Sequence, residues 1–243
     1  MSRFFVDKEQ VMDDKIIITG DDVKHIAKVL RLRAGEELFV CDKCGTDYHC
    51  EISEISSDCV SAKIIEKAEN TAEPPIRITL YQGMPKSDKL DYIVQKCVEL
   101  GVCTIVPVIT KRAVSIPRDS EKKVIRWQRI AEEAAKQSGR GSIPEVADVV
   151  DFRTALSQMQ QSEALNLMPY ECEKDSKLRE VLAKSDKREI NILIGPEGGF
   201  DEAEAEAAKK AGVNTVTLGP RILRTETAPL AVCAAVMYEL GDW

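Results

Sequence analysis

The chain has 243 residues, which suits one large domain or two smaller ones, and 44 % of them are hydrophobic, enough for a substantial core. The formal net charge of −7 argues mildly against a nucleic-acid partner. However, residues 77–140 hold 13 Lys or Arg against 7 Asp or Glu, whereas residues 1–70 hold 10 against 15 and residues 141–243 hold 11 against 18. This basic middle is either a phosphate-binding patch or a solvated helix face.

Several classes of protein are disfavoured by simple features. The sequence contains no run of 18 apolar residues, which argues against a membrane-spanning helix. The first residues become charged too soon for a signal peptide, so we expect a cytoplasmic protein whose eight cysteines are mostly reduced.

Residues 1–70 are predicted to form a small β-barrel domain, because several short strands are separated by turn signals. One helix is expected over Asp22–Leu30, with Asp21 as its cap. Residues 71–75 contain two prolines and no periodicity, and are interpreted as a linker. The expected strands are Phe4–Val6, Lys15–Thr19, Glu37–Cys41, Tyr48–Ile55 and Val60–Ile65.

Residues 76–243 alternate between strand and helix patterns, which predicts an α/β domain with a mostly parallel sheet covered on both faces. Ser87 is expected to cap the first helix and Gly101 to end it, while Asp201 and Glu204 form a predicted capping box. The expected strands are Ile76–Tyr81, Thr104–Ile109, Ala164–Met168, Ile190–Ile194 and Thr215–Leu218. The expected helices are Asp88–Leu100, Ser120–Ser138, Ser176–Lys184, Glu202–Ala211 and Thr225–Leu240.

Two glycine-proline turns each follow a short apolar run in the last quarter of the chain. The first turn spans residues 195–200, and the second spans residues 218–228. Glycines allow a ligand to approach the backbone, and the free N–H groups of a helix start can bind it. Proline after the first glycine removes one donor, so these loops suit contacts to an adenine ring and a small polar tail better than a phosphate.

Two basic regions are candidates for RNA contact. In the helix over Ser120–Ser138, the spacing places Arg126, Glu133, Gln137 and Arg140 on one face, where surface salt bridging is the alternative. A second cluster in the first domain consists of Arg3, His25, Arg31 and Arg33, on weaker grounds of spacing.

Other chemistries have little support. Cys41 and Cys44 have the spacing of half a zinc site, but the second half is missing, so no metal is expected. The sequence has neither the glycine fingerprint of dinucleotide enzymes nor the P-loop motif. Both histidines lie in the first domain, and no nucleophile elbow is present, which disfavours a Ser-His-Asp hydrolase.

The whole chain resembles the RsmE family of 16S ribosomal RNA (uracil-N3)-methyltransferases, within the SPOUT superfamily. The two glycine-proline turns are its most specific matches, and the others run through the chain in order. The remaining matches are Arg3-Phe4-Phe5-Val6, the segment 25–31, the segment 95–102, Arg126-Trp127 and the segment 133–140.

The resemblance implies a PUA-like RNA-binding barrel in residues 1–70 and a SPOUT-type domain with a trefoil knot in residues 76–243. It implies S-adenosylmethionine as cofactor, a homodimer, and action on small-subunit ribosomal RNA at a uridine of the decoding region. The residues expected to bind the cofactor are Leu167, Gly195, Pro196, Glu197, Gly198, Gly199, Leu218, Gly219, Ile222, Leu223, Arg224, Thr225 and Thr227. Those expected to bind RNA are Arg3, His25, Arg31, Arg33, Lys86, Arg126 and Gln137.

For the chemistry, Arg140 or Arg112 is expected to stabilise developing charge on the base, and Glu133 or Glu226 to accept the N3 proton. Two alternatives remain open. One is an enzyme of the same superfamily acting on a ribose 2′-hydroxyl or on transfer RNA. The other is a non-catalytic RNA-binding factor for ribosome assembly.

Overall fold

The computed structural model describes residues 3–114 and 119–243. Contacts between Cα atoms divide the chain into two compact units. The N-terminal unit comprises residues up to Glu73 together with Ala135–Ile143, and the C-terminal unit comprises Pro74–Ala134 and Pro144–Trp243. Within the described ranges, no helix is both long and apolar enough to cross a lipid bilayer.

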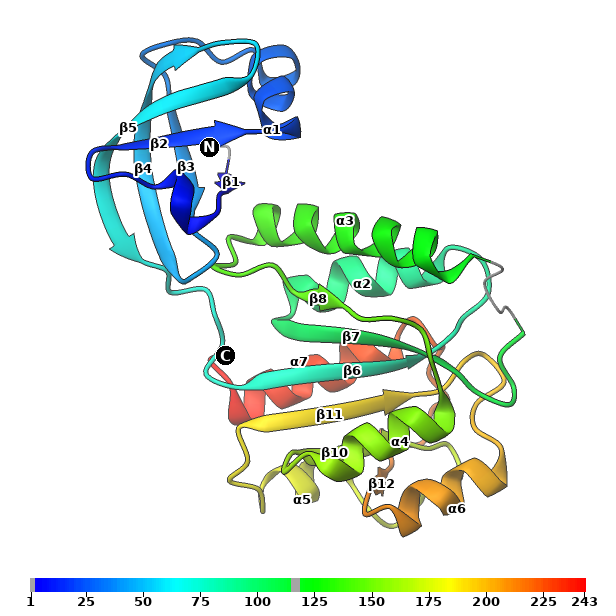
Figure 1. The fold of residues 1–243 in the computed structure, drawn as a ribbon. Coiled ribbons are helices and arrows are strands. Elements are labelled where there is room, and N and C mark those ends of the chain that lie inside the picture. The colour runs from blue at the N-terminus through cyan, green and yellow to red at the C-terminus, as the bar shows by residue number, and fades with distance from the viewer. Residues whose placement is uncertain (1–2, 115–118) are drawn as a thin grey trace. The chain divides into compact units, whose positions relative to one another are not determined.

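The N-terminal unit is built on a five-stranded sheet with the order β1-β3-β4-β5-β2 (Figure 1). Neighbouring strands are antiparallel except for the parallel pair β1 and β3. All five strands expected from the sequence are present. Their bounds are β1 Arg3–Phe5, β2 Lys15–Thr19, β3 Glu37–Cys41, β4 Thr46–Ile55 and β5 Cys59–Glu69.

Alternation along these strands produces the core of the unit, because successive side chains point to opposite faces. Ile16 and Ile18 on β2 pack with Leu38 and Val40 on β3, and all four are at most 1 % exposed. A short 3₁₀ turn, η1 (Lys8–Gln10), leads into β2.

The helix of this unit differs from the prediction. It begins at Asp21 after Gly20, so Asp21 is its first residue and not its cap. After α1 (Asp21–Lys24), the helix continues as the wider π-helical turn η2 (His25–Leu30). This helical segment ends at Arg31, whose φ is 56°. A left-handed residue ends a helix, which explains the sharp exit.

The segment Ala135–Ile143 belongs to the N-terminal unit through polar contacts. The Lys136 ammonium lies 3.0 Å from the Asp22 carboxylate, and Asn70 donates to the carbonyl of Gly139 at 3.1 Å. The Arg140 guanidinium donates to both oxygens of Glu73 at 2.8 and 2.9 Å. Glu73 also accepts the backbone N–H of Gly141, so it holds the whole segment.

The C-terminal unit contains a parallel sheet with the order β12-β10-β11-β6-β7-β8, and β9 also pairs with β7. Val102, Ile105 and Val108 on β7 are fully buried, as expected for a sheet covered on both faces. The bounds are β6 Arg77–Gly83, β7 Val102–Ile109, β8 Glu145–Val146, β9 Val150–Asp151, β10 Leu165–Pro169, β11 Glu189–Ile194 and β12 Asn214–Val216.

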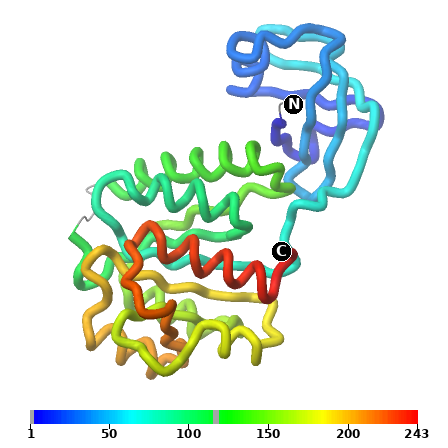
Figure 2. The backbone as a smooth tube through the Cα atoms, turned by 180° about the vertical axis from the view of Figure 1, so that it is seen from behind, coloured from blue at the N-terminus to red at the C-terminus, as the bar shows by residue number. Residues whose placement is uncertain are grey.

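Helices cover both faces of this sheet (Figures 1 and 2). Helices α4 and α6 pack on one face, where Met159 and Ala208 meet Met168 and Leu193 of the strands. Helices α2 and α7 contact each other and the strands from the opposite face. The bounds are α2 Lys89–Glu99, α3 Ser120–Ser138, α4 Phe152–Gln161, α5 Leu178–Leu182, α6 Glu202–Lys210 and α7 Ala228–Leu240.

Of the cap predictions for the C-terminal unit, two are confirmed and one is wrong. Asp201 and Glu204 form the predicted capping box of α6. Gly101, with φ of 87°, follows the end of α2. The start of α2 is displaced, because Asp88 precedes its first residue and Ser87 lies outside with φ of 56°.

Helix α4 was not predicted. Its signals are present in the sequence: Asp151 accepts the N–H of Thr154 at 2.7 Å, and Ala155 and Met159 are buried at a spacing of four.

We expect Glu73→Gln to destabilise the N-terminal unit. The substitution removes the Glu73 carboxylate from the Arg140 side chain, which is 3 % exposed. Because Glu73 itself is 30 % exposed, the loss should lie toward the lower end of the roughly 3–5 kcal/mol seen when a buried ion pair is broken. Urea unfolding at pH 7 measures it, with the exposed Glu69→Gln as control.

The difference in unfolding free energy between the wild type and Glu73→Gln should also depend on pH. Burial opposes ionisation of Glu73. The hydrogen bond and charge of Arg140, together with hydrogen bonds from Ser142 and Gly141 to Glu73, outweigh this and lower the pKa of Glu73. The stabilisation is therefore complete above the unfolded-state pKa of about 4.3 and is lost as pH falls through the lower folded-state pKa. Equal unfolding midpoints for the variant and the wild type at pH 7 would contradict this role.

Candidate functional site

The first glycine-proline turn connects β11 to α6. The N–H of Gly199 donates to the carbonyl of Pro196 at 2.9 Å, and Gly199 has a φ of 64°. A Cβ added at Gly195 would lie 3.3 Å from the backbone of Gly199, so glycine keeps the turn compact. Asp201 then caps α6, which fixes the exit of the turn.

The second turn connects β12 to α7. Its first part is held by the N–H of Gly219, which donates to Thr217 Oγ1 at 3.2 Å, and Gly219 has a φ of 101°. At its far end, the N–H groups of Thr227 and Ala228 both donate to the carbonyl of Arg224 at 2.9 Å.

A buried hydrogen-bond chain joins the two turns. Thr225 Oγ1 of the second turn donates to the carbonyl of Gly195 in the first at 2.8 Å. The same hydroxyl accepts from Gln82 Nε2 at 3.2 Å, at the end of the neighbouring strand β6. Thr225 is 5 % exposed and Gln82 is fully buried, so this contact is shielded from water.

An ion-pair network joins the same turns closer to the surface. The Lys89 ammonium lies 3.1 Å from the Glu197 carboxylate of the first turn and 3.0 Å from the Glu226 carboxylate of the second. The hydrogen bonds to Glu226 and Glu197 raise the pKa of Lys89. Burial opposes ionisation of Glu226, but the Lys89 ammonium and other local contacts lower its pKa overall, so it is held as a carboxylate.

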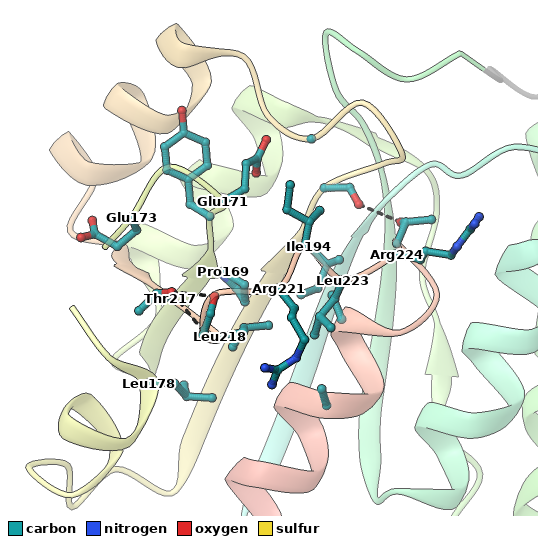
Figure 3. Close-up of a pocket in the computed structure, with 18 of the residues that line it drawn as sticks. Pro169, Glu171, Glu173, Leu178, Ile194, Thr217, Leu218, Arg221, Leu223 and Arg224 are labelled. Atoms are coloured by element: carbon teal, nitrogen blue, oxygen red, sulfur yellow. Dashed lines mark hydrogen bonds between the residues drawn. The ribbon is translucent and has the colours of Figure 1, made fainter. Parts of the chain in front are cut away.

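A cavity of about 1520 Å³ opens between the turns, the loop after β10, and α7 (Figure 3). Because β10 lies between β11 and β12, the loop that follows it necessarily stands between the two turns. Ligands of open α/β sheets bind at such carboxyl ends of strands. Apolar walls come from Pro169, Leu178, Ile194, Leu218 and Leu223.

The loop after β10 is fixed by Glu173. Its carboxylate accepts the Thr215 hydroxyl at 2.7 Å, the N–H groups of Asp175 and Ser176 at 3.2 and 3.3 Å, and the Lys209 ammonium at 3.5 Å. The Thr215 hydrogen bond is the largest cause that lowers the pKa of Glu173 to about 2.

Most of the expected cofactor residues line this cavity. They are Gly195, Pro196, Glu197, Gly198, Gly199, Leu218, Gly219, Ile222, Leu223, Arg224 and Thr225. Leu167 does not line it, because it is fully buried within β10. Pro169 stands two residues further along the same strand face and takes that place. Thr227 precedes α7 and lies outside the lining, whereas Ala228 is part of it.

The loop after β10 and the side of α7 were missed by the sequence analysis. They contribute Tyr170, Glu171 and Leu178 from the loop region, and Ala231 and Ala235 from the helix. The signal that would have identified them is the strand order, because only the position of β10 between β11 and β12 brings its loop to the turns.

The four expected catalytic residues are not brought together. Arg112 lies beside the first turn, where its guanidinium donates to the carbonyl of Gly198 at 3.0 Å. Glu226 is paired with Lys89, and Glu133 is exposed on α3 outside the cavity lining. Arg140 is buried against Glu73, because α3 ends at Ser138 and Gly139, with φ of 77°, turns the chain. The predicted helix face therefore does not include Arg140.

The expected RNA residues differ in availability. Arg31 and Arg33 are exposed on the N-terminal unit, and His25 is half-buried edge-on against Phe4. Arg3 is paired with Asp47 and its side chain is 13 % exposed, which favours a structural role. Gln137 and Lys86 are exposed, and Arg126 is half-exposed and paired with Asp91.

All eight cysteines are free thiols. Burial raises the pKa of Cys41 and of Cys50 to about 11, so neither is a thiolate at neutral pH. Within residues 3–114 and 119–243, no group of three or more His, Cys, Asp or Glu side chains is placed to hold a metal ion.

We expect Glu173→Gln to release the loop after β10. Amide hydrogen exchange at Asp175 and Ser176 should become faster than in the wild type, because an amide side chain is a weaker acceptor than a carboxylate. Wild-type protection should persist at pH 4, since a group with a pKa of about 2 is still ionised there. Glu171→Gln, on the same loop, is the control, and unchanged exchange in Glu173→Gln would contradict the anchoring role.

The sequence matches two family models over most of its length. The model of an RNA methyltransferase PUA domain matches residues 18–65, and that of an RNA methyltransferase domain matches residues 72–237. The expected fold class, a PUA-like domain followed by a SPOUT-like α/β domain with a parallel sheet, is confirmed.

Similar proteins agree with these models along the whole chain. The ribosomal RNA small subunit methyltransferase E of Bacillus subtilis is 38 % identical, with 98 % of this chain and 97 % of that protein covered. The enzyme of the same name from Synechocystis is 31 % identical, with 96 % and 76 % covered. The crystal structure of the Neisseria gonorrhoeae enzyme bound to S-adenosyl methionine has a TM-score of 0.91 at 35 % identity, with 100 % and 99 % covered. The chain therefore belongs to the ribosomal RNA small subunit methyltransferase E family.

Proposed function

We propose that this protein transfers a methyl group from S-adenosylmethionine to N3 of a uridine in the 16S RNA of the small ribosomal subunit, in the cytoplasm. The observation that carries this proposal is the pair of glycine-proline turns at the ends of β11 and β12, which meet at one cavity. The decoding region is the location that the family resemblance implies for the target base.

The residues of the cavity fit this cofactor. Both Gly195 and Gly198 line the cavity, where their backbone can contact a ligand. A Cβ would lie 3.3 Å from the Gly199 backbone at Gly195 and 3.2 Å from Arg112 at Gly198, so contacts within the protein favour glycine at both positions. Leu218 and Leu223 offer apolar surface to an adenine ring, and Ile194 adds to it. The resemblance further implies that these turns belong to a trefoil knot, and the knot stays a prediction.

When bound, S-adenosylmethionine supplies an electrophilic methyl group on its sulfonium. The protein has to hold the uracil in line and stabilise the negative charge that develops on it as N3 loses its proton. Arg112 is our candidate for the second task, because its guanidinium stands at the first turn and its side chain is 46 % exposed. Arg140 is less suited, since its side chain is 3 % exposed and donates to both oxygens of Glu73 at 2.8 and 2.9 Å, whereas the Asp201 carboxylate lies 3.9 Å from Arg112.

Of the two candidate bases, Glu226 is the weaker. A carboxylate whose ionised form is stabilised by Lys89 has less tendency to take up a proton. Glu133 is exposed on α3, and we keep it as the other candidate for the general base. For RNA, Arg31 and Arg33 are the exposed cations of the N-terminal unit that we expect to contact phosphates.

Methyl transfer tests the proposal directly. Labelled S-adenosylmethionine is incubated with the protein and with small subunits that lack the modification, and the RNA is then analysed as nucleosides. The expected product is 3-methyluridine. A ribose-methylated product, or transfer to transfer RNA, would favour the other enzyme class, and binding of RNA without transfer or cofactor binding would favour the assembly factor.

We expect Arg112→Gln to reduce turnover by about 100-fold or more, the effect of removing one donor to a developing anion. Its affinity for S-adenosylmethionine in calorimetry should stay close to that of the wild type. The control is Lys122→Gln, an exposed cation of α3 that pairs with Asp119 and lies outside the cavity lining. Normal turnover of Arg112→Gln would remove this residue from the mechanism.

We also infer that the protein is a homodimer in which α7 contributes to the interface. This helix is apolar on nearly all sides, yet one face with Ala231, Ala235 and Tyr238 at helical spacing is left partly or fully exposed, and Tyr238 is 73 % exposed. The same face lines the cavity, so the interface would adjoin the cofactor site. Ile222, which precedes the helix, is 87 % exposed. A second copy of the chain is an occupant that would cover such a face.

We expect Ala231→Arg to shift the protein from dimer to monomer in sedimentation or light scattering, because a charge would be placed within an apolar contact. Ala207→Arg is the matched control, since Ala207 is also an exposed alanine on a helix, α6. Monomeric wild-type protein at all accessible concentrations would contradict the homodimer.

A further inference from the structure

Lys89 occupies an unfavourable position for a lysine if only its own helix is considered. It is the first residue of α2, where the helix dipole repels a positive charge. The compensation comes from outside the helix, because both carboxylates within 3.1 Å of its ammonium belong to the two turns of the cavity. The reason for a cation here therefore lies in the site, not in the stability of α2.

Removal of this ammonium would leave two carboxylates facing one position. Glu197 and Glu226 each have a side chain that is 25 % exposed, so their mutual repulsion is only partly screened by water. Glu197 also accepts the backbone N–H of Lys86 at 3.1 Å, which ties the first turn to the segment before α2. The ammonium thus converts a repulsion between the turns into an attraction.

The neutral contact between the turns is separate from this network. Thr225 and Gly195 remain hydrogen-bonded whatever the charge at position 89, since Gln82 supports Thr225 from β6. A variant at Lys89 is therefore expected to fold, with the turns still adjacent but less closely held.

We propose that Lys89 is a positioning residue that holds the two turns at the spacing the cofactor requires, through Glu197 and Glu226. The proposal rests on the function proposed above, because the cofactor is the ligand whose binding depends on the distance between the two turns. Lys89 itself lines the cavity, and the role assigned to it here is to position the turns.

The test compares Lys89→Met with Lys89→Arg. Lys89→Met keeps the length of the side chain and removes the charge. We expect its dissociation constant for S-adenosylmethionine in calorimetry to rise roughly tenfold, in the range for members of one ion-pair network, with a smaller change in kcat at saturating cofactor. Lys89→Arg should restore most of the affinity, since it restores the cation.

Lys96→Met is the matched control. Lys96 lies on the same helix with a similar exposure, but its ammonium pairs with Glu99 of the same helix, at 2.7 Å. We expect it to bind cofactor like the wild type. An unchanged dissociation constant in Lys89→Met, or an equal loss in Lys96→Met, would overturn the proposal.

Two further measurements separate this role from a direct contact to the cofactor. Adding Glu197→Gln and Glu226→Gln to Lys89→Met removes the repulsion and should recover part of the lost affinity, whereas a lost direct contact would not be recovered. Hydrogen exchange without cofactor should be faster at Gly199 and Thr225 in Lys89→Met than in the wild type. If the wild type neither binds the cofactor nor methylates RNA, the proposed function fails, and this exchange measurement still decides whether Lys89 holds the turns.

Discussion

The cavity depends on the parallel pairing of β10 with both β11 and β12. This pairing brings to one edge of the sheet two turns that are separated in sequence by α6, with a third loop between them. The Thr225 to Gly195 hydrogen bond can form only at this edge, and the Lys89 network and the Glu173 anchor are built around the same arrangement. Local residues determine the conformation of each turn, whereas the strand order brings the turns together into one site.

The sequence predicted the elements well where periodicity and caps agree. The strands Lys15–Thr19 and Glu37–Cys41 and the helix Ser120–Ser138 have the expected bounds, and the capping box at Asp201 is present. Helix α4 was missed although the Asp151 cap and the apolar spacing of Ala155 and Met159 mark it, because its apolar stripe is short. The start of α1 was misplaced because Gly20, and not an acidic side chain, precedes it.

The site was predictable only in part, for a physical reason. Glycines, prolines and the threonine of the turns are local signals, and most of them do line the cavity. Leu167 lies outside the cavity lining, because a strand pattern does not say at which residue the strand leaves the sheet. The partners of Arg140 and Glu226 were invisible, since Glu73 and Lys89 are distant in sequence and reach them only through the fold.

The discontinuity of the N-terminal unit has a consequence for how the chain is made. Its polar residues Asp22, Asn70 and Glu73 each bond to a residue of Ala135–Ile143. During synthesis, the strands of this unit therefore leave the ribosome well before the segment that completes them. Residues 74–134 of the other unit have to be made in between. Bringing Ala135–Ile143 back to the first unit closes this long loop, which costs more conformational entropy than the pairing of neighbouring strands does. The N-terminal unit is thus complete only once residue 143 has been made, and the C-terminal unit only once its second segment, Pro144–Trp243, has followed.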